Sequence, residues 1–201
     1  MKIIGISGRM KAGKTTVARH LLSIISSTTS PITYISTNGF FSYPKKVFAD
    51  LFGYSGVDMD SQEFKDDVHY CGKTNRVLMQ EFGRKMREIW LDIWVEHWKE
   101  GVLDLTQDDQ LVIVPDVRFP NEVKAIQDMG GIVIRLTRNP VNSNDETETA
   151  LDEMAIHSGL SWMPYGKPDK FDRTVDNAIM SIDETNEICL KIAKEYINAK
   201  N

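Results

Sequence analysis

The sequence predicts an α/β fold in which a parallel sheet of about five strands carries helices on both faces. Short apolar segments alternate with amphipathic helical segments along the 201 residues. One apolar segment, Leu111–Val114, is continuous and is followed by Pro115 and Asp116, as is typical of a central strand buried on both faces. In such sheets, ligands bind at the carboxyl ends of the strands.

The expected elements follow from these patterns. Strands are predicted at 2–7, 32–36, 111–114, 132–136 and 173–175. Helices are predicted at 14–25, 44–52, 74–98, 121–129, 148–158 and 183–199. We expect the helix over 74–98 to break near Gly83, and the segment 53–72, rich in Asp, Gly and Ser, to form a mobile loop.

Composition limits the possible functions. Hydrophobic residues make up 41% of the chain and charged residues 26%, which is ordinary for a soluble globular protein. The net charge of -5 argues against a polymeric nucleic acid partner, which usually needs a basic face. The two cysteines, Cys71 and Cys189, lack metal-ligand spacing and are consistent with a reducing compartment. No apolar run reaches the length of a membrane span, so we expect a cytoplasmic location.

Residues Gly8–Thr15 match the phosphate-binding pattern G-x-x-x-x-G-K-[ST] between a predicted strand and a predicted helix. Such a loop directs backbone N–H groups and a helix N-terminus at an anion. Lys14 can reach the outer phosphates of a nucleoside triphosphate, and the Thr15 hydroxyl can ligate Mg²⁺. We therefore predict an ATP- and Mg²⁺-dependent protein of the P-loop class. The predicted cofactor-binding residues in this segment are Gly8, Lys11, Ala12, Gly13, Lys14, Thr15 and Thr16.

A second acidic position follows the central strand. Asp116 stands where phosphate-loop enzymes place an acid that orients Mg²⁺, although an acid that merely caps a turn is the alternative. Arg118 can clamp a phosphate, or it can be a surface residue paired with Glu122. Arg138 begins a polar segment that can close over the reactants. Lys14, Asp116, Arg118 and Arg138 are the predicted catalytic residues, and Thr15 and Asp116 the predicted metal ligands.

The segment after the second predicted strand bears on the acceptor. A hydroxyl acceptor needs a base, whereas a nucleoside monophosphate already offers anionic oxygens. The segment reads Ser36-Thr37-Asn38-Gly39 and holds no carboxylate, which favours a phosphate acceptor. Trp94 shares a four-residue spacing with Trp90 and Trp98 that is typical of a packed helix face, yet Trp94 or Phe41 can border a base pocket.

The chain resembles the deoxynucleoside monophosphate kinases of bacteriophages and their relatives. The resemblance rests on the phosphate loop, Phe41…Pro44-Lys45-Lys46, Arg76…Leu78-Met79-Gln80…Gly83…Arg87…Trp94, Val114-Pro115-Asp116-Val117-Arg118…Asn121-Glu122, the strand before Arg138, Ser143-Asn144-Asp145 with Glu148, and Phe171-Asp172…Val175-Asp176-Asn177. It departs from the family pattern at Tyr43 and Arg84, and it is shorter after Asp145.

The resemblance implies ATP-dependent phosphorylation of deoxynucleoside monophosphates to diphosphates. It also implies a single domain over 1–201, with an acceptor-binding helical region at about 39–100, a lid-like segment at about 138–150, and a possible homodimer. By the same resemblance, Asn177 belongs to the loop that borders the adenine of ATP and is a predicted cofactor-binding residue. A phage-encoded chain would act in the host cytoplasm. The implied substrate-binding residues are Lys46, Arg76, Gln80, Arg87, Trp94, Asp116, Arg118, Glu122 and Glu148.

Two other functions fit the phosphate loop. One is a kinase that acts on a nucleoside or another small metabolite, which would need a base. The other is a regulatory protein that switches with nucleotide state. The guanine-reading pattern N-K-x-D is absent from the sequence, which disfavours the switch.

Overall fold

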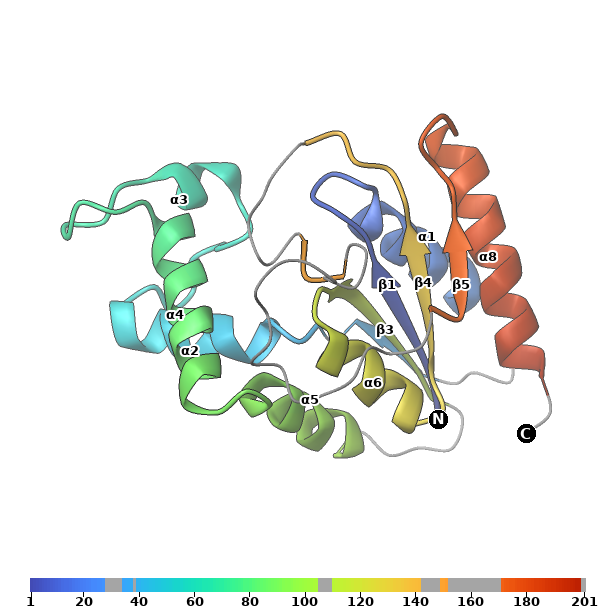
Figure 1. The fold of residues 1–201 in the computed structure, drawn as a ribbon, viewed down its shortest axis with the longest axis horizontal. Coiled ribbons are helices and arrows are strands. Elements are labelled where there is room, and N and C mark those ends of the chain that lie inside the picture. Colours follow the sequence, from blue (N-terminus) through green and yellow to red (C-terminus); the bar gives the residue numbers. More distant parts are fainter. Residues whose placement is uncertain (28–33, 38, 105–109, 142–148, 152–170, 200–201) are drawn as a thin grey trace. The chain divides into compact units, whose positions relative to one another are not determined.

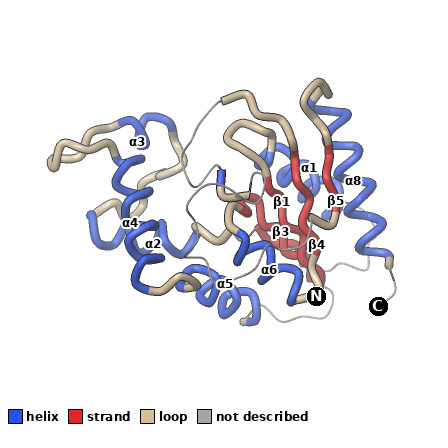
Figure 2. Tube along the Cα trace, viewed as in Figure 1, coloured by secondary structure: helices blue, strands red, loops and turns tan. Residues whose placement is uncertain are grey.

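The computed structural model describes residues 1–27, 34–37, 39–104, 110–141, 149–151 and 171–199. Its five strands form one sheet in the order β2-β3-β1-β4-β5, and every neighbouring pair is parallel (Figures 1 and 2). The predicted parallel α/β fold is confirmed. The strands are β1 (Lys2–Ser7), β2 (Tyr34–Thr37), β3 (Gln110–Val117), β4 (Ile132–Leu136) and β5 (Arg173–Val175).

Helices cover both faces of this sheet. In Figure 1, α1 and α8 lie on one face and α6 lies on the other. The helices are α1 (Lys14–Ser27), α2 (Ser42–Phe52), α3 (Gln62–Asp66), α4 (Asn75–Ile89), α5 (Ile93–Leu103), α6 (Pro120–Asp128) and α8 (Ile182–Asn198). No helix in the described part of the chain is both long enough and apolar enough to cross a membrane.

The core of the sheet forms because alternate strand residues point to opposite faces. Ile4 and Ile6 of β1 pack on the same side as Val17 and Leu21 of α1, and Cys189 of α8 joins them. On the opposite side, Gly5 lies against Ile126 of α6: a Cβ there would be 2.7 Å from the Ile126 Cδ1 atom. The central strands are therefore buried on both faces, as their continuous apolar sequence predicts.

Two expectations about the middle of the chain are wrong. The segment 53–72 contains a short helix, α3 (Gln62–Asp66). Ser61 caps this helix, because its side chain accepts a hydrogen bond from the Phe64 N–H group. The helical region after Thr74 breaks at Trp90, whose backbone is extended, and not at Gly83. A glycine costs a helix about 1 kcal/mol relative to alanine, which tertiary packing can offset.

The chain forms two compact units. One consists of residues 1–39 and 99–201 and contains the sheet, and the other consists of residues 40–98 and is helical. The helical unit has its own cluster of buried side chains, formed by Phe48, Phe64 and Met79.

Candidate functional site

The carboxyl ends of all five strands lie along one edge of the sheet, because the strands are parallel. Ser7 at the end of β1 is opposite Val117 of β3 and Arg135 of β4. Leu136 is opposite Val175 near the end of β5. The phosphate loop, Arg138 and Asn177 follow β1, β4 and β5, and Asp116 lies at the end of β3, so these predicted site residues are on a common edge.

The loop between β1 and α1 has the strand–loop–helix arrangement of a P-loop. Gly8 and Gly13 have positive φ angles of 154° and 106°. A Cβ atom at Gly8 would lie 3.1 Å from the Leu136 carbonyl oxygen, so the loop passes close to β4. Lys11, with a φ of 61°, is the one non-glycine residue with positive φ in the described ranges. Such strain is concentrated at ligand-binding loops.

Lys14 is the first residue of α1 and is buried, at 8% exposure. Its Nζ atom donates to the carbonyl oxygens of Gly8 at 2.6 Å and Arg9 at 2.9 Å. The cation is therefore held against the backbone of the loop. Thr15 and Thr16 are exposed in the first turn of α1, where a helix N-terminus favours an anion.

Asn177 joins the phosphate loop to two other segments of the same unit. Its side-chain Nδ2 donates to the Ala12 carbonyl oxygen at 3.0 Å, and its Oδ1 accepts from the Arg138 N–H group at 2.8 Å. The residue is 1% exposed. In this arrangement Asn177 positions the phosphate loop relative to the segments that follow β4 and β5.

The Arg138 guanidinium is directed at the segment after β5. Its Nε atom donates to the Asn177 carbonyl oxygen at 3.1 Å, and an Nη atom donates to the Met180 carbonyl oxygen. These contacts give the side chain a structural function. Its predicted role on the transferred phosphate stays a prediction, and 142–148 of the predicted lid lie outside the described residues.

Asp116 is half-buried at the end of β3, and Gly39 lies directly beside its carboxylate. A Cβ atom at Gly39 would be 2.5 Å and 2.7 Å from the two Asp116 carboxylate oxygens. A carboxylate therefore lies close to the segment that follows β2, where the sequence itself has none. This carboxylate, which comes from the neighbouring strand β3, weakens the sequence argument that no base is available after β2.

Glu122 caps the N-terminus of α6. Its Oε2 atom accepts hydrogen bonds from the backbone N–H groups of Arg118 at 2.6 Å and Phe119 at 3.1 Å. The side chain is buried, at 6% exposure. Glu122 thus fixes the turn that carries Arg118, through the backbone of Arg118. A direct role of either residue on substrate stays a prediction.

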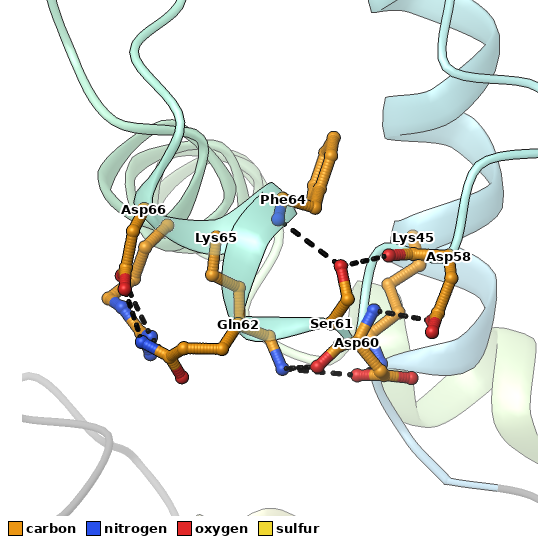
Figure 3. A network of polar contacts seen from close by, with 9 residues as sticks. Lys45, Asp58, Asp60, Ser61, Gln62, Phe64, Lys65 and Asp66 are labelled. Atoms are coloured by element: carbon orange, nitrogen blue, oxygen red, sulfur yellow. Dashed lines mark hydrogen bonds and ion pairs between the residues drawn. The ribbon is translucent and has the colours of Figure 1, made fainter.

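In the helical unit, several basic side chains contact an acidic segment before and within α3 (Figure 3). Lys45 Nζ lies 2.6 Å from Asp60 Oδ1, and Arg76 Nη2 lies 3.5 Å from Asp66 Oδ1. Burial raises the pKa of Asp60, but the hydrogen bond and charges of Lys45 and Lys65 outweigh it and lower that pKa overall. Arg76 thus contacts this segment, whereas its predicted contact with substrate is untested.

The other predicted acceptor residues differ in burial. Arg87 is 8% exposed on α4, whereas Lys46 and Gln80 are exposed. Trp94 is buried, and its Nε1 atom donates to the Gly83 carbonyl oxygen at 3.2 Å, which makes it a core residue of the helical unit. Phe41 remains half-buried. Glu148 lies outside the described residues.

Sequence reasoning missed two features of the site. Gly39 carries no motif of its own, and only its position after β2 could have drawn attention to it. Arg135 carries no motif either, yet its Nη1 atom donates to the Ser7 Oγ atom at 2.9 Å. Its guanidinium also lies 5.5 Å from the centre of the Phe171 ring.

The sequence resembles one curated protein of Acanthamoeba polyphaga mimivirus, named "Putative deoxynucleotide monophosphate kinase". The two are 28% identical over 173 residues, which cover 79% of this chain and 85% of the relative. The predicted resemblance is confirmed. No family model matches the sequence.

Among solved structures, this chain is similar to the APS kinase of Mycobacterium tuberculosis in complex with AMPPNP and APS. The identity is 13%, the TM-score is 0.46, and the match covers 96% of this chain and 97% of that chain. A similarity this distant supports no statement about substrate.

Proposed function

We propose that the protein transfers the γ-phosphate of ATP to a deoxynucleoside monophosphate, or to its ribose counterpart, and forms a diphosphate with the help of Mg²⁺. The observation that carries the proposal is the strained phosphate loop with Lys14 buried against it. Catalysis of phosphoryl transfer consists mostly of positioning and charge stabilisation, which such a loop supplies. The name of the mimivirus relative supports the choice of acceptor.

The metal would be held by few protein atoms. Within the described residues, no group of three or more His, Cys, Asp and Glu side chains could hold a metal ion. The Thr15 hydroxyl and the Asp116 carboxylate are hard oxygen donors, which Mg²⁺ prefers, and Mg²⁺ usually takes its remaining ligands from substrate phosphates and water. When bound, Mg²⁺ would neutralise charge on the phosphates as it develops.

Most of the proposed acceptor-binding residues belong to the helical unit. Arg87 is a buried guanidinium on α4, and arginine binds phosphate with two parallel hydrogen bonds where the geometry allows. Phe41 provides an aromatic surface on which a base can stack. We assign the remaining predicted substrate contacts, Lys46, Gln80 and Arg118, to the acceptor phosphate or base as proposals.

The expected location of the protein is the cytoplasm.

One observation favours a second candidate, a kinase of nucleosides. The Asp116 carboxylate beside Gly39 could accept the proton of a hydroxyl acceptor. In that case, the enzyme would need no cations for an acceptor phosphate.

A coupled assay with ATP separates the two candidates. The acceptors are the four common deoxynucleosides and their 5′-monophosphates, each tested at several concentrations with Mg²⁺. We expect kcat/KM to favour the best monophosphate by about a thousandfold or more, because a site built to bind a polar group of its substrate strongly rejects an analogue that lacks that group. Comparable turnover of nucleosides and monophosphates would contradict the proposal and support the nucleoside kinase.

A further inference from the structure

Gly83 occupies an unexpected place in α4. It lies near the middle of a 15-residue helix, between Asn75 and Ile89, and it is buried. Glycine is about 1 kcal/mol less favourable than alanine in a helix interior. A glycine here therefore needs a reason in the packing around it.

The Phe41 ring crowds the place where a Cβ atom of residue 83 would be, and the Arg87 guanidinium lies at an ordinary contact distance from it. That atom would lie 3.0 Å from Phe41 Cε2 and 3.7 Å from Arg87 Nη1. The Phe41 ring and the Arg87 guanidinium thus approach the same point on the helix surface. On the same residue, the Gly83 carbonyl oxygen accepts from Trp94 Nε1, which fixes the backbone.

The chemistry of these two groups matches a nucleotide acceptor. An aromatic ring stacks on a nucleobase, and a guanidinium binds a phosphate. We infer that Gly83 is a specificity-determining residue of the acceptor site: its missing side chain lets the Phe41 ring lie against α4 beside the Arg87 guanidinium, so that the two can hold one nucleoside monophosphate. The inference rests on the proposed function and adds a residue to which no substrate role was assigned.

The substitution Gly83→Ala tests the inference. The new Cβ atom forces the Phe41 ring to shift by a few tenths of an ångström, since 3.0 Å is tighter than an ordinary contact. Because alanine favours the helix, the variant should stay folded. We expect its KM for the best monophosphate to rise on the order of tenfold, with KM for ATP unchanged. Isothermal titration calorimetry with the monophosphate alone should show the same loss of affinity.

Two further variants serve as controls. Lys85→Ala alters an exposed residue of the same helix, whose side chain contacts Glu88, and should leave both KM values unchanged. Phe41→Leu removes the ring atoms that the new methyl group meets, so Gly83→Ala should have little additional effect in that background.

The outcomes separate the inference from the proposed function. If the wild-type protein binds a monophosphate without phosphorylating it, the proposed function fails and calorimetry still decides the inference. Unchanged monophosphate affinity in Gly83→Ala would overturn the inference, as would a wild-type protein that binds no monophosphate. Equal losses for ATP and monophosphate, with a lower melting temperature, would also overturn it, because they indicate a purely structural glycine.

Discussion

At the scale of single residues, two glycines outside the phosphate loop make room for a neighbouring side chain, the Asp116 carboxylate at Gly39 and the Phe41 ring at Gly83. Gly39 lies beside the Asp116 carboxylate, and Gly83 lies beside the Arg87 guanidinium. The motif alone identified Gly8 and Gly13, because their spacing to Lys14 is diagnostic. Neither Gly39 nor Gly83 could be assigned a role from sequence. The role of Gly39 depends on Asp116, which is distant along the chain, and that of Gly83 depends on the packing of the Phe41 ring on α4.

The Gly39 contact leads to a prediction about Asp116. In Gly39→Ala, the new methyl group would lie less than 3 Å from the carboxylate, so either the carboxylate or the backbone must move. Misplacement of a catalytic group by about 1 Å can cost a hundredfold in rate. We expect turnover to fall by about that factor, and the Mg²⁺ concentration needed for half-maximal ATP-induced thermal stabilisation to rise.

The control for this prediction is a double-mutant comparison. Once Asp116→Asn has removed the carboxylate charge, adding Gly39→Ala should reduce activity little further, since both changes act on one group. Independent, multiplicative losses would show that Gly39 acts through the backbone and not through Asp116.

At the scale of elements, most strands and helices follow from apolar periodicity, and the exceptions have local causes. The helix α3 is five residues long, too short for its periodicity to be recognised. The break between α4 and α5 lies at Trp90, because the Phe41 and Trp94 contacts keep Gly83 within the helix. The pairing of α8 with α1 could be expected only in outline, from its amphipathic pattern.

The packing of α8 predicts a loss of stability at alkaline pH. Burial raises the pKa of the Cys189 thiol to about 11, from a usual value of 9.0. Between these pH values the unfolded chain releases a proton that the folded chain retains. The contribution of this thiol to the free energy of unfolding should therefore be fully present below pH 9 and be lost as the pH rises towards 11. The loss is about 2–3 kcal/mol at most.

Urea unfolding at a series of pH values between 8 and 11 measures this loss. Cys189→Ala should be less stable at pH 8, because it leaves a cavity, yet its stability should decline less steeply with pH. Cys71→Ala, which changes the exposed cysteine, is the matched control and should retain the wild-type slope. Tyr196, whose pKa is also raised, mainly by burial, contributes a remaining slope in both variants.

At the scale of the whole molecule, the resemblance implies one domain with a helical region at about 39–100, and the structure has a compact helical unit over residues 40–98. The boundary between the two units at Trp98 and Lys99 has no linker rich in Pro, Gly or Ser, because α5 continues across it. Domain boundaries are usually recognised by such linkers, so continuous helix hides this one.

The burial of Lys14 against the phosphate loop predicts how the molecule responds to ATP when this lysine is lost. A ligand that binds only the folded state stabilises it by RT ln(1 + [L]/Kd), which is about 2.7 kcal/mol at a hundredfold excess over Kd. Lys14→Ala removes the cation held at the phosphate loop and two hydrogen bonds to loop carbonyls. We expect the variant to stay folded, with a loss of about 1–3 kcal/mol in its own stability.

The measurement is a pair of thermal melts, with and without Mg²⁺ and ATP, for wild type and Lys14→Ala. The wild-type melting temperature should rise with ATP concentration, whereas the variant should show little ATP-induced rise and no detectable phosphoryl transfer. Lys85→Ala, which removes an exposed lysine of the helical unit, should retain the full ATP-induced rise. A folded Lys14→Ala variant with normal turnover would show that Gly8–Thr15 is not the donor site, because a cation that stabilises the transition state cannot be removed without slowing the reaction.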